Sequence, residues 1–288
     1  MLWCAKRTGV LVLCLSCTGW FCWGQSIGPP NQTVSANQVI SIRRPSPRKL
    51  QLFIAKQDTA PQHHRAYHPF RANKKQHYTL QISSRLGRDR YKEQFMFLYR
   101  DDLVDLVGSW QYEDNQVGDV DAFAREPYIL RFKCLNTVLE DLVLIPVHTK
   151  PDDSMKELDE LYDVFLEVTK KWKTDNVMIL GDFNADGSYL SKKGMKAIRI
   201  RSDKNFHWLI EDDVDTTANT GNDNTYDRIV IYGDDMLDAV VPNSAKPFNF
   251  QIEYGLSEED ALKVSDHYPV EVELKRKTPT EQSSATGK

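Results

Sequence analysis

Six short apolar runs, spaced between residues 95 and 274, constrain the fold of this chain more than any other feature of its sequence. Each run has four to six residues rich in Val, Ile, Leu, Phe and Tyr, and polar or turn-forming residues separate it from the next. Runs of this length are typical of β-strands that are buried on at least one face. We therefore expect strands at 95–99, 128–132, 142–147, 177–180, 229–232 and 270–274.

Helical patterns interrupt this series of strands in three places. Ser154 and Glu157 have the spacing of a capping box, and the residues up to Trp172 place an apolar stripe on one face of a helix. Shorter helices are expected at 192–198 and 257–262. Strands that alternate with helices in this way predict a mixed α/β fold. The expected apolar stripe consists of Leu158, Leu161, Tyr162, Phe165, Leu166 and Val168.

The composition excludes several classes of protein. Hydrophobic residues make up 41% and charged residues 27% of the 288 residues. These values are ordinary for a globular protein, so wholesale disorder and a collagen-like fibre are excluded. No apolar run of membrane-spanning length follows the N-terminal segment, which excludes a multi-span membrane protein. The length suits one large domain or two ordinary ones.

The charge is distributed unevenly and marks a junction near residue 75. Residues 1–75 hold eleven Lys and Arg but a single acid, Asp58, whereas the remainder holds 26 basic and 40 acidic residues. Six of the thirteen prolines also fall within the first 75 residues. We expect 25–76 to be a basic, Pro-rich and mostly irregular segment, with possible strands at 39–42 and 50–55. Residues 276–288 are expected to form a polar, disordered tail.

The first 24 residues have the pattern of a targeting segment. Lys6 and Arg7 precede an apolar run at 9–23, and the small residue Gly24 follows it. We expect a cleaved secretory signal, and hence a secreted or secretory-pathway protein with no stable membrane insertion after signal removal. A retained anchor is one alternative, and a segment without targeting function, which would leave the chain intracellular, is another. After cleavage Cys134 would be the remaining cysteine, so no internal disulfide is expected.

Polar residues stand at the ends of the expected strands, where an active site would gather them. Taken singly, an Asp at a strand end is usually a turn residue, and a single His is usually a surface residue. Taken in order, Leu-Gly-Asp-Phe-Asn-Ala at 180–185 and Ser-Asp-His-Tyr-Pro at 265–269 resemble the signature of the endonuclease/exonuclease/phosphatase superfamily. The polar residues at the strand ends are His148, Asp182, Asn184, Asp227, Asp266 and His267.

Residues 77–275 resemble the deoxyribonuclease I family in particular. The resemblance implies an α/β fold of the α+β type, a four-layer sandwich of two mostly antiparallel sheets flanked by helices. It also implies a divalent-metal-dependent endonuclease that hydrolyses phosphodiester bonds in DNA with low sequence specificity. The stretches that carry it lie at 90–95, 123–127, 145–148, 160–164, 225–230, 241–245 and 265–271.

The resemblance assigns catalytic roles to four positions. His148 and His267 would form the acid–base pair, with Glu93 orienting His148 and Asp227 orienting His267. Phosphodiester hydrolysis needs an activated water, a proton donor for the leaving 3′-oxygen and cations that offset the phosphate charge. A carboxylate at an imidazole N–H fixes the tautomer and raises the basicity of the ring.

Metal and DNA contacts are implied at five further positions. Asp182, Asn184 and Asp266 would face a metal ion, and hard oxygen ligands suit Mg²⁺, Ca²⁺ or both, with Mn²⁺ as an alternative. Tyr91 would lie along the minor groove of DNA, Arg125 would approach a backbone phosphate, and Asn184 would face the scissile phosphate. Such contacts position a duplex with little base specificity.

The first strand–helix–strand unit of the family has no counterpart in this sequence. That unit carries an Asn, a metal-binding Glu and an Arg that contacts DNA, yet no Glu occurs before Glu93. We therefore expect an N-terminally incomplete domain with unpaired strand edges and impaired activity. A catalytically inactive binding relative and an unstable splice product are the alternatives. A phospholipid phosphodiesterase or an abasic-site endonuclease of the same superfamily is a further rival.

The resemblance also bears on protein partners. Several relatives bind actin through an apolar strand at the position of Leu80 and Ile82. The aromatic residue expected at Leu80 is missing, so we predict no actin binding. DNA is the expected partner, and we expect the chain to act as a monomer.

Overall fold

The computed structural model describes residues 2–6, 10–16, 78–88, 90, 92–114 and 121–278, with only the backbone described at 2–6 and 10–16. The possible strands at 39–42 and 50–55 lie outside these residues. Most of the expected C-terminal tail, from 279 to 288, lies outside them as well.

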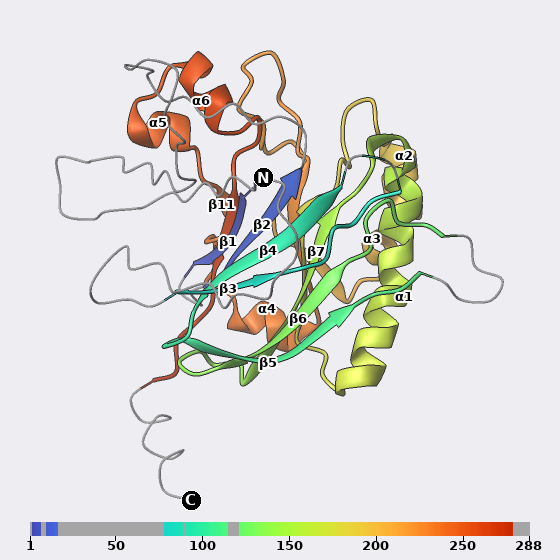
Figure 1. The fold of residues 1–288 in the computed structure, drawn as a ribbon, viewed down its shortest axis with the longest axis vertical. Helices are drawn as coiled ribbons and strands as arrows, with labels where there is room; N and C mark the ends of the chain where they lie inside the picture. Colours follow the sequence, from blue (N-terminus) through green and yellow to red (C-terminus); the bar gives the residue numbers. More distant parts are fainter. Residues whose placement is uncertain are drawn as a thin grey trace, which may run out of the picture.

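Two six-stranded β-sheets form the body of the protein (Figure 1). Among the described strands, the neighbouring pairs β1–β12 and β7–β8 are parallel and all others are antiparallel. The expectation of two mostly antiparallel sheets is therefore confirmed. The first sheet has the order β11 (Lys246–Pro247), β12 (Val270–Glu273), β1 (Leu2–Lys6), β2 (Val10–Ser16), β4 (Glu93–Arg100) and β3 (Tyr78–Ile82). The second has the order β5 (Val104–Gln111), β6 (Tyr128–Cys134), β7 (Asp141–His148), β8 (Val177–Asp182), β10 (Asp227–Tyr232) and β9 (Phe206–Trp208).

The N-terminal segment supplies two central strands of the first sheet. β1 runs parallel to β12, and all seven residues of β2 pair with β4, from Val10 opposite Tyr99 to Ser16 opposite Glu93. Unpaired edges were expected here because the first structural unit of the deoxyribonuclease I family is absent. Instead, residues within the signal-like segment fill the space between β12 and β4. Cleavage of that segment after Gly24 stays a prediction, and it would remove both strands.

Helices cover the outer face of the second sheet. The buried side chains of α1 pack on β7 and β8 through an apolar cluster that includes Leu161, Phe165, Ile145 and Ile179. Figure 1 shows α1 running along this sheet, with α2 and α3 beside it. The helices expected at 154–172, 192–198 and 257–262 are confirmed within two residues. The described helices are α1 (Ser154–Trp172), α2 (Lys192–Ala197), α3 (Arg199–Ser202), α4 (Asp234–Ala239), α5 (Phe250–Tyr254) and α6 (Glu258–Val264).

Two expected details of α1 are wrong. A 3₁₀ turn at Pro151–Asp153 precedes the helix, so Asp153 is the N-cap and makes no side-chain capping bond. Ser154 lies inside the helix, and Glu157 accepts a hydrogen bond from the backbone N–H of Lys150 at 3.0 Å instead of closing a capping box. Leu166 is 46% exposed because it lies outside the apolar stripe, about 80° around the helix from Leu158.

The hydrophobic core has two main layers. Between the sheets, Phe95, Phe97 and Tyr99 of β4 pack in one cluster with Phe132 of β6 and Leu144 of β7. The second layer lies between the second sheet and α1. This sandwich holds the ends of β4, β7, β8, β10 and β12 rigidly, and those ends carry the polar residues selected from the sequence.

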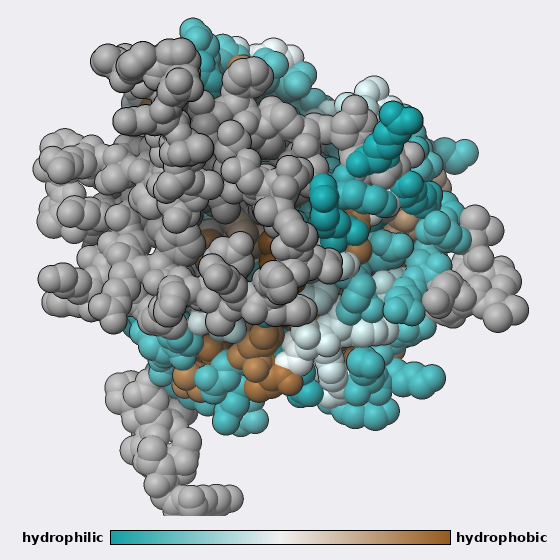
Figure 2. Space-filling view, viewed as in Figure 1, coloured by the Kyte–Doolittle hydropathy of each residue, from teal (hydrophilic) through white to brown (hydrophobic). Residues whose placement is uncertain are grey.

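No helix in the described part of the chain is long and apolar enough to cross a bilayer. Among the coloured residues in Figure 2, most of the visible surface is hydrophilic, and apolar residues show in several places, most clearly near the lower edge of the view.

Candidate active site

Strand pairing brings three of the selected residues side by side. His148 ends β7 and lies opposite Asp182 at the end of β8, and Asp182 lies opposite Asp227 at the start of β10. Glu93 begins β4 in the other sheet, and His267 lies three residues before β12. The two sheets therefore present both predicted His–carboxylate pairs at one end of the sandwich.

A tight turn after β8 fixes the position of Asp182. Gly181 has a φ of +145°, and a Cβ atom there would lie 1.9 Å from the carbonyl oxygen of Val147. Asn184 adopts a left-handed φ of 45°, which Asn tolerates better than most residues. Its backbone N–H donates to Oδ1 of Asp182 at 2.9 Å, and its side-chain Nδ2 donates to the carbonyl oxygen of Thr149 at 3.0 Å. The Gly-Asp-Phe-Asn motif is thus a turn that joins the ends of β7 and β8.

Replacing Gly181 by Ala is expected to destabilise the protein by more than about 3 kcal/mol, because the new Cβ would overlap the backbone of β7. Gly255 is the matched control. It also has a positive φ, of +63°, but a Cβ there would meet nothing within 4 Å. Gly255→Ala should therefore cost only the left-handed strain of about 1 kcal/mol. Urea denaturation of both variants measures the two losses, and equal losses would contradict the close approach at Gly181.

The first His–carboxylate pair is also bound by an arginine. Nδ1 of His148 lies 2.6 Å from Oε2 of Glu93, and Nη1 of Arg125 donates to Oε1 of Glu93 at 2.8 Å. Nε of Arg125 donates to the carbonyl oxygen of His148 at 2.9 Å. Because an ionised carboxylate only accepts hydrogen bonds, Nδ1 of His148 carries a proton and its Nε2 points elsewhere. Nε2 lies 3.6 Å from Oδ2 of Asp182.

The second pair is more deeply buried. Nδ1 of His267 lies 2.6 Å from Oδ2 of Asp227, and its backbone N–H donates to Oγ of Ser265 at 3.1 Å. Burial alone would lower the pKa of His267, but the charge and hydrogen bond of Asp227 outweigh burial and raise it to about 9. The ring of Tyr226 stacks on the imidazole at 5.7 Å between centroids. In the metal-free protein, His267 is therefore a cation at neutral pH.

Asp182 lies between the two pairs and is only 1% exposed. Burial raises its pKa, the negative charge of Asp227 adds to this rise, and the charges of His148 and His267 oppose it. A nearby cation would lower the pKa of such a carboxyl group, because the cation favours its ionised form.

The donor atoms near Asp182 suit a hard metal ion. Asp182 and Asn184 offer oxygen atoms, and Asp266 is exposed next to His267. The described residues contain no group of three His, Cys, Asp or Glu side chains that could hold a metal by itself. Mg²⁺ commonly binds through one or two carboxylates and takes its other ligands from water and substrate phosphate. The type of donor therefore fits Mg²⁺ or Ca²⁺.

The predicted DNA contacts of Tyr91 and Arg125 stay predictions. Tyr91 lies outside the described residues. Arg125 was expected at a DNA phosphate, yet its side chain is only 15% exposed and contacts Glu93. The sequence did not single out Thr216, whose fully buried hydroxyl accepts the backbone N–H groups of Tyr226 at 3.0 Å and Asp227 at 3.1 Å. No local pattern distinguishes this Thr, because its partners are ten and eleven residues away along the chain.

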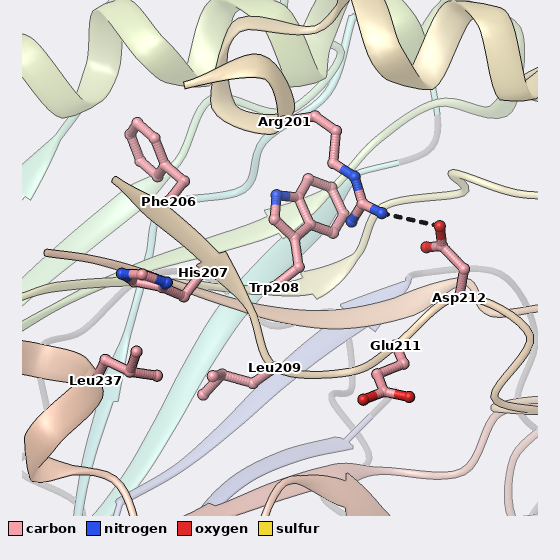
Figure 3. Close-up of a pocket in the computed structure, with 8 residues that line it drawn as sticks. All are labelled: Arg201, Phe206, His207, Trp208, Leu209, Glu211, Asp212 and Leu237. Carbon is pink, nitrogen blue, oxygen red and sulfur yellow. Dashed lines mark hydrogen bonds and ion pairs between the residues drawn. The ribbon is translucent and has the colours of Figure 1, made fainter. Parts of the chain in front are cut away.

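A shallow groove of about 520 Å³ opens elsewhere, beside β9 (Figure 3). The guanidinium of Arg201 lies over the ring of Trp208 at 4.7 Å and pairs with Asp212 at 2.8 Å. His207 and Leu237 line its other side. Neither His–carboxylate pair lines this groove, so it is separate from the site described above.

Known proteins resemble this chain in sequence over most of its described body. The Endonuclease/Exonuclease/phosphatase family matches residues 43–267. Deoxyribonuclease gamma of Rattus norvegicus is 50% identical over 197 residues, which are 68% of this chain and 64% of the rat protein. Deoxyribonuclease-1 of Oryctolagus cuniculus is 48% identical over 198 residues, which are 68% of this chain and 70% of the rabbit protein. The chain thus spans just under two thirds of the rat protein that it matches.

A solved structure, of a functionally unknown conserved protein from Enterococcus faecalis V583, aligns with 69% of this chain and 77% of that chain. It is 17% identical, with a TM-score of 0.46. The family match covers more than half of this chain, and the rabbit relative is nearly half identical over more than two thirds of its length. The chain therefore belongs to the endonuclease/exonuclease/phosphatase family, and within it to the deoxyribonuclease I family.

Proposed function

We propose that this chain is a divalent-metal-dependent DNA endonuclease that hydrolyses phosphodiester bonds with low sequence specificity. The observation that carries the proposal is the pair of His–carboxylate contacts, each 2.6 Å long, on either side of the buried Asp182. Two oriented imidazoles suit a reaction that removes one proton and delivers another. The relatives named deoxyribonuclease support DNA as the substrate.

The two histidines divide the proton transfers between them. Glu93 and Asp227 hold the Nδ1 protons, so each Nε2 is the ring nitrogen that would exchange a proton with the substrate. One imidazole accepts a proton from the attacking water, and the other donates a proton to the leaving 3′-oxygen. Each carboxylate stabilises the imidazolium that its partner forms. Tyr226 keeps the ring plane of His267 fixed by stacking on it.

Asp182, Asn184 and Asp266 would hold the metal ion, Mg²⁺ or Ca²⁺ with Mn²⁺ as an alternative. When bound, the ion supplies positive charge that offsets the negative charge on the phosphate in the transition state. Residues 76–288 hold more acidic than basic side chains, 40 against 26, so cations would also reduce repulsion between the body and DNA.

The proposed contacts are to the phosphate backbone and the minor groove of DNA. Tyr91 would lie along the minor groove, and Asn184 would face the scissile phosphate. Two nitrogens of Arg125 are occupied by His148 and Glu93, so a third would approach a backbone phosphate. None of these contacts reads a base edge in the major groove, which accounts for low sequence specificity.

Purified full-length chain is expected to nick supercoiled plasmid in Mg²⁺ plus Ca²⁺, and a chelator should abolish the nicking. The same assay with His148→Ala tests whether the activity belongs to this site and not to a contaminant. A panel with phospholipid and abasic-site substrates separates a deoxyribonuclease from other hydrolases. Persistent nicking by His148→Ala, or preference for another substrate, would overturn the proposal.

The absence of any Glu before Glu93 favours a second candidate, a catalytically inactive DNA-binding relative. One missing electrostatic group commonly costs about 10² to 10³ in rate. We therefore expect nicking slower by about that factor than nicking by rabbit deoxyribonuclease-1. A cooperatively folded protein that retains DNA but never nicks it supports the inactive relative.

We propose entry into the secretory pathway through residues 1–24. Cleavage after Gly24 would remove both β1 and β2, so the pairing of these strands supports a segment that remains in the folded protein. The intact mass of protein collected from the medium of expressing cells distinguishes a retained segment from a cleaved one.

A further inference from the structure

Glu157 is a buried acid that no step of the proposed reaction uses. It lies in the N-terminal part of α1 and is only 1% exposed. Burial raises its pKa to about 7, hydrogen bonds from the backbone of Lys150 and Ala124 and the charge of Arg125 oppose the rise, and Asp153 adds to it. Keeping a carboxylate in such a place costs stability, because an apolar side chain would pack there without loss of hydration.

One carboxylate holds two separate segments of the chain. Oε1 of Glu157 accepts the backbone N–H of Lys150 at 3.0 Å, and the carboxylate also accepts a hydrogen bond from the backbone of Ala124. Lys150 follows His148 by two residues, and Ala124 directly precedes Arg125. The two segments held by Glu157 are thus the ones that carry His148 and Arg125.

Arg125 also connects the segment of His148 to its own segment, independently of Glu157. Arg125 donates to the carbonyl oxygen of His148 at 2.9 Å and to Glu93 at 2.8 Å, and Glu93 in turn binds Nδ1 of His148. Contacts therefore form a closed ring through Glu157, Arg125, Glu93 and His148. Removing Glu157 would remove one of the two links between these segments, so the backbone of His148 and the imidazole that it carries would be held less firmly.

We infer that Glu157 is a positioning residue for the His148–Glu93 pair. This inference rests on the proposed function, since it assigns Glu157 to the same reaction. Ala124 directly precedes Arg125, which would approach a DNA phosphate, so loss of Glu157 should lower kcat by a larger factor than it raises KM for DNA. Supporting residues of this kind commonly contribute about tenfold to a hundredfold.

Three variants of the full-length chain test this role in the plasmid-nicking assay. Glu157→Leu accepts no hydrogen bond, and should lower kcat about tenfold to a hundredfold with a smaller rise in KM. Glu157→Gln keeps an accepting oxygen and should restore kcat. Leu161→Ala removes a buried core side chain of the same helix, so it should lower the melting temperature while kcat stays within about twofold.

The pH dependence of stability gives a readout independent of catalysis. A carboxyl group whose folded pKa is raised stabilises the fold below about 4.5, and this contribution is lost as pH rises through 7. The melting temperature of the wild type should therefore fall, relative to that of Glu157→Gln, as the pH rises from 4.5 to 7.5. Parallel curves for the two proteins would contradict a buried, ionising Glu157.

A fourth variant, Lys150→Pro, tests the same hydrogen bond in case Glu157→Leu does not fold. Lys150 has a φ of −76°, which suits proline, so Lys150→Pro removes the donated N–H and leaves Glu157 in place. It should lower kcat as Glu157→Leu does, and the low-field NMR signal of the His148 Nδ1 proton should weaken in both. Unchanged kcat in both folded variants would overturn the positioning role. An inactive wild type that retains the NMR signal would instead overturn the proposed function.

Discussion

Deleting residues 1–24 is expected to abolish cooperative folding of this chain. The deletion removes β1 and β2, which lie next to each other between β12 and β4. Two missing strands would leave a gap of about 14 Å between β12 and β4, since neighbouring strands lie about 4.8 Å apart. Both strands would then expose unpaired N–H and C=O groups along edges that face each other across the gap. Circular dichroism during heating should show no sharp transition for the deleted chain.

Matched variants separate loss of the strands from loss of chain length. Removing residues 282–288, which the sequence predicts to be a polar tail, should leave the transition unchanged. Val12→Pro removes one N–H from the middle of β2, opposite Phe97, and should lower the melting temperature sharply. If the chain without residues 1–24 melts like the intact one, the pairing of β1 and β2 does not stabilise the fold. The segment would then act as a removable signal.

Replacing His267 by Ala is expected to lower kcat for plasmid nicking by at least about a thousandfold. The variant loses one proton-transfer group, worth about 10² to 10⁴ in rate. It also removes the cation that balances the buried charge of Asp227 next to Asp182. His207→Ala is the matched control, because this His lies in the groove beside β9 and near Asp234. Equal rates for wild type and His267→Ala would remove His267 from the catalytic site.

The titration of His267 checks the same pair without any substrate. Its folded pKa of about 9 lies above the ordinary 6.5, so the pair stabilises the metal-free fold fully below pH 6.5. That contribution, about 3 kcal/mol, should be lost as pH rises through 9. Asp227→Asn should flatten this dependence in urea denaturation curves recorded with chelator. A dependence of equal size in Asp227→Asn would show that another group causes it.

Much of the second sheet could be predicted from the sequence because its strands are buried and short. Runs such as 142–147 and 177–180 are apolar throughout, and the structure places them in β7 and β8. β5 escaped detection because Val107 is 54% exposed and the register shifts between Leu106 and Gly108. β9 has only three residues and lies at the edge of its sheet. Neither strand has the continuous apolar pattern on which the prediction depended.

The two His–carboxylate pairs could be predicted from the family resemblance, whereas the contacts that support them could not. Glu157 has the spacing of a capping residue, but the 3₁₀ turn before α1 directs its carboxylate to Lys150 instead. Arg125 carries the charge expected of a phosphate contact, and only tertiary packing shows that it binds Glu93. Arg125 and Glu93 are 32 residues apart, so a local pattern cannot connect them.

The pairing of β2 with β4 connects the N-terminal segment to the proposed active site. Its last pair joins Ser16 to Glu93, the residue that orients His148. A protease that clips the chain within its first sixteen residues would thus withdraw support from a catalytic carboxylate that lies 77 positions further along. This arrangement is the reverse of a zymogen: the intact chain would be the working form, and limited proteolysis at the N-terminus would switch it off.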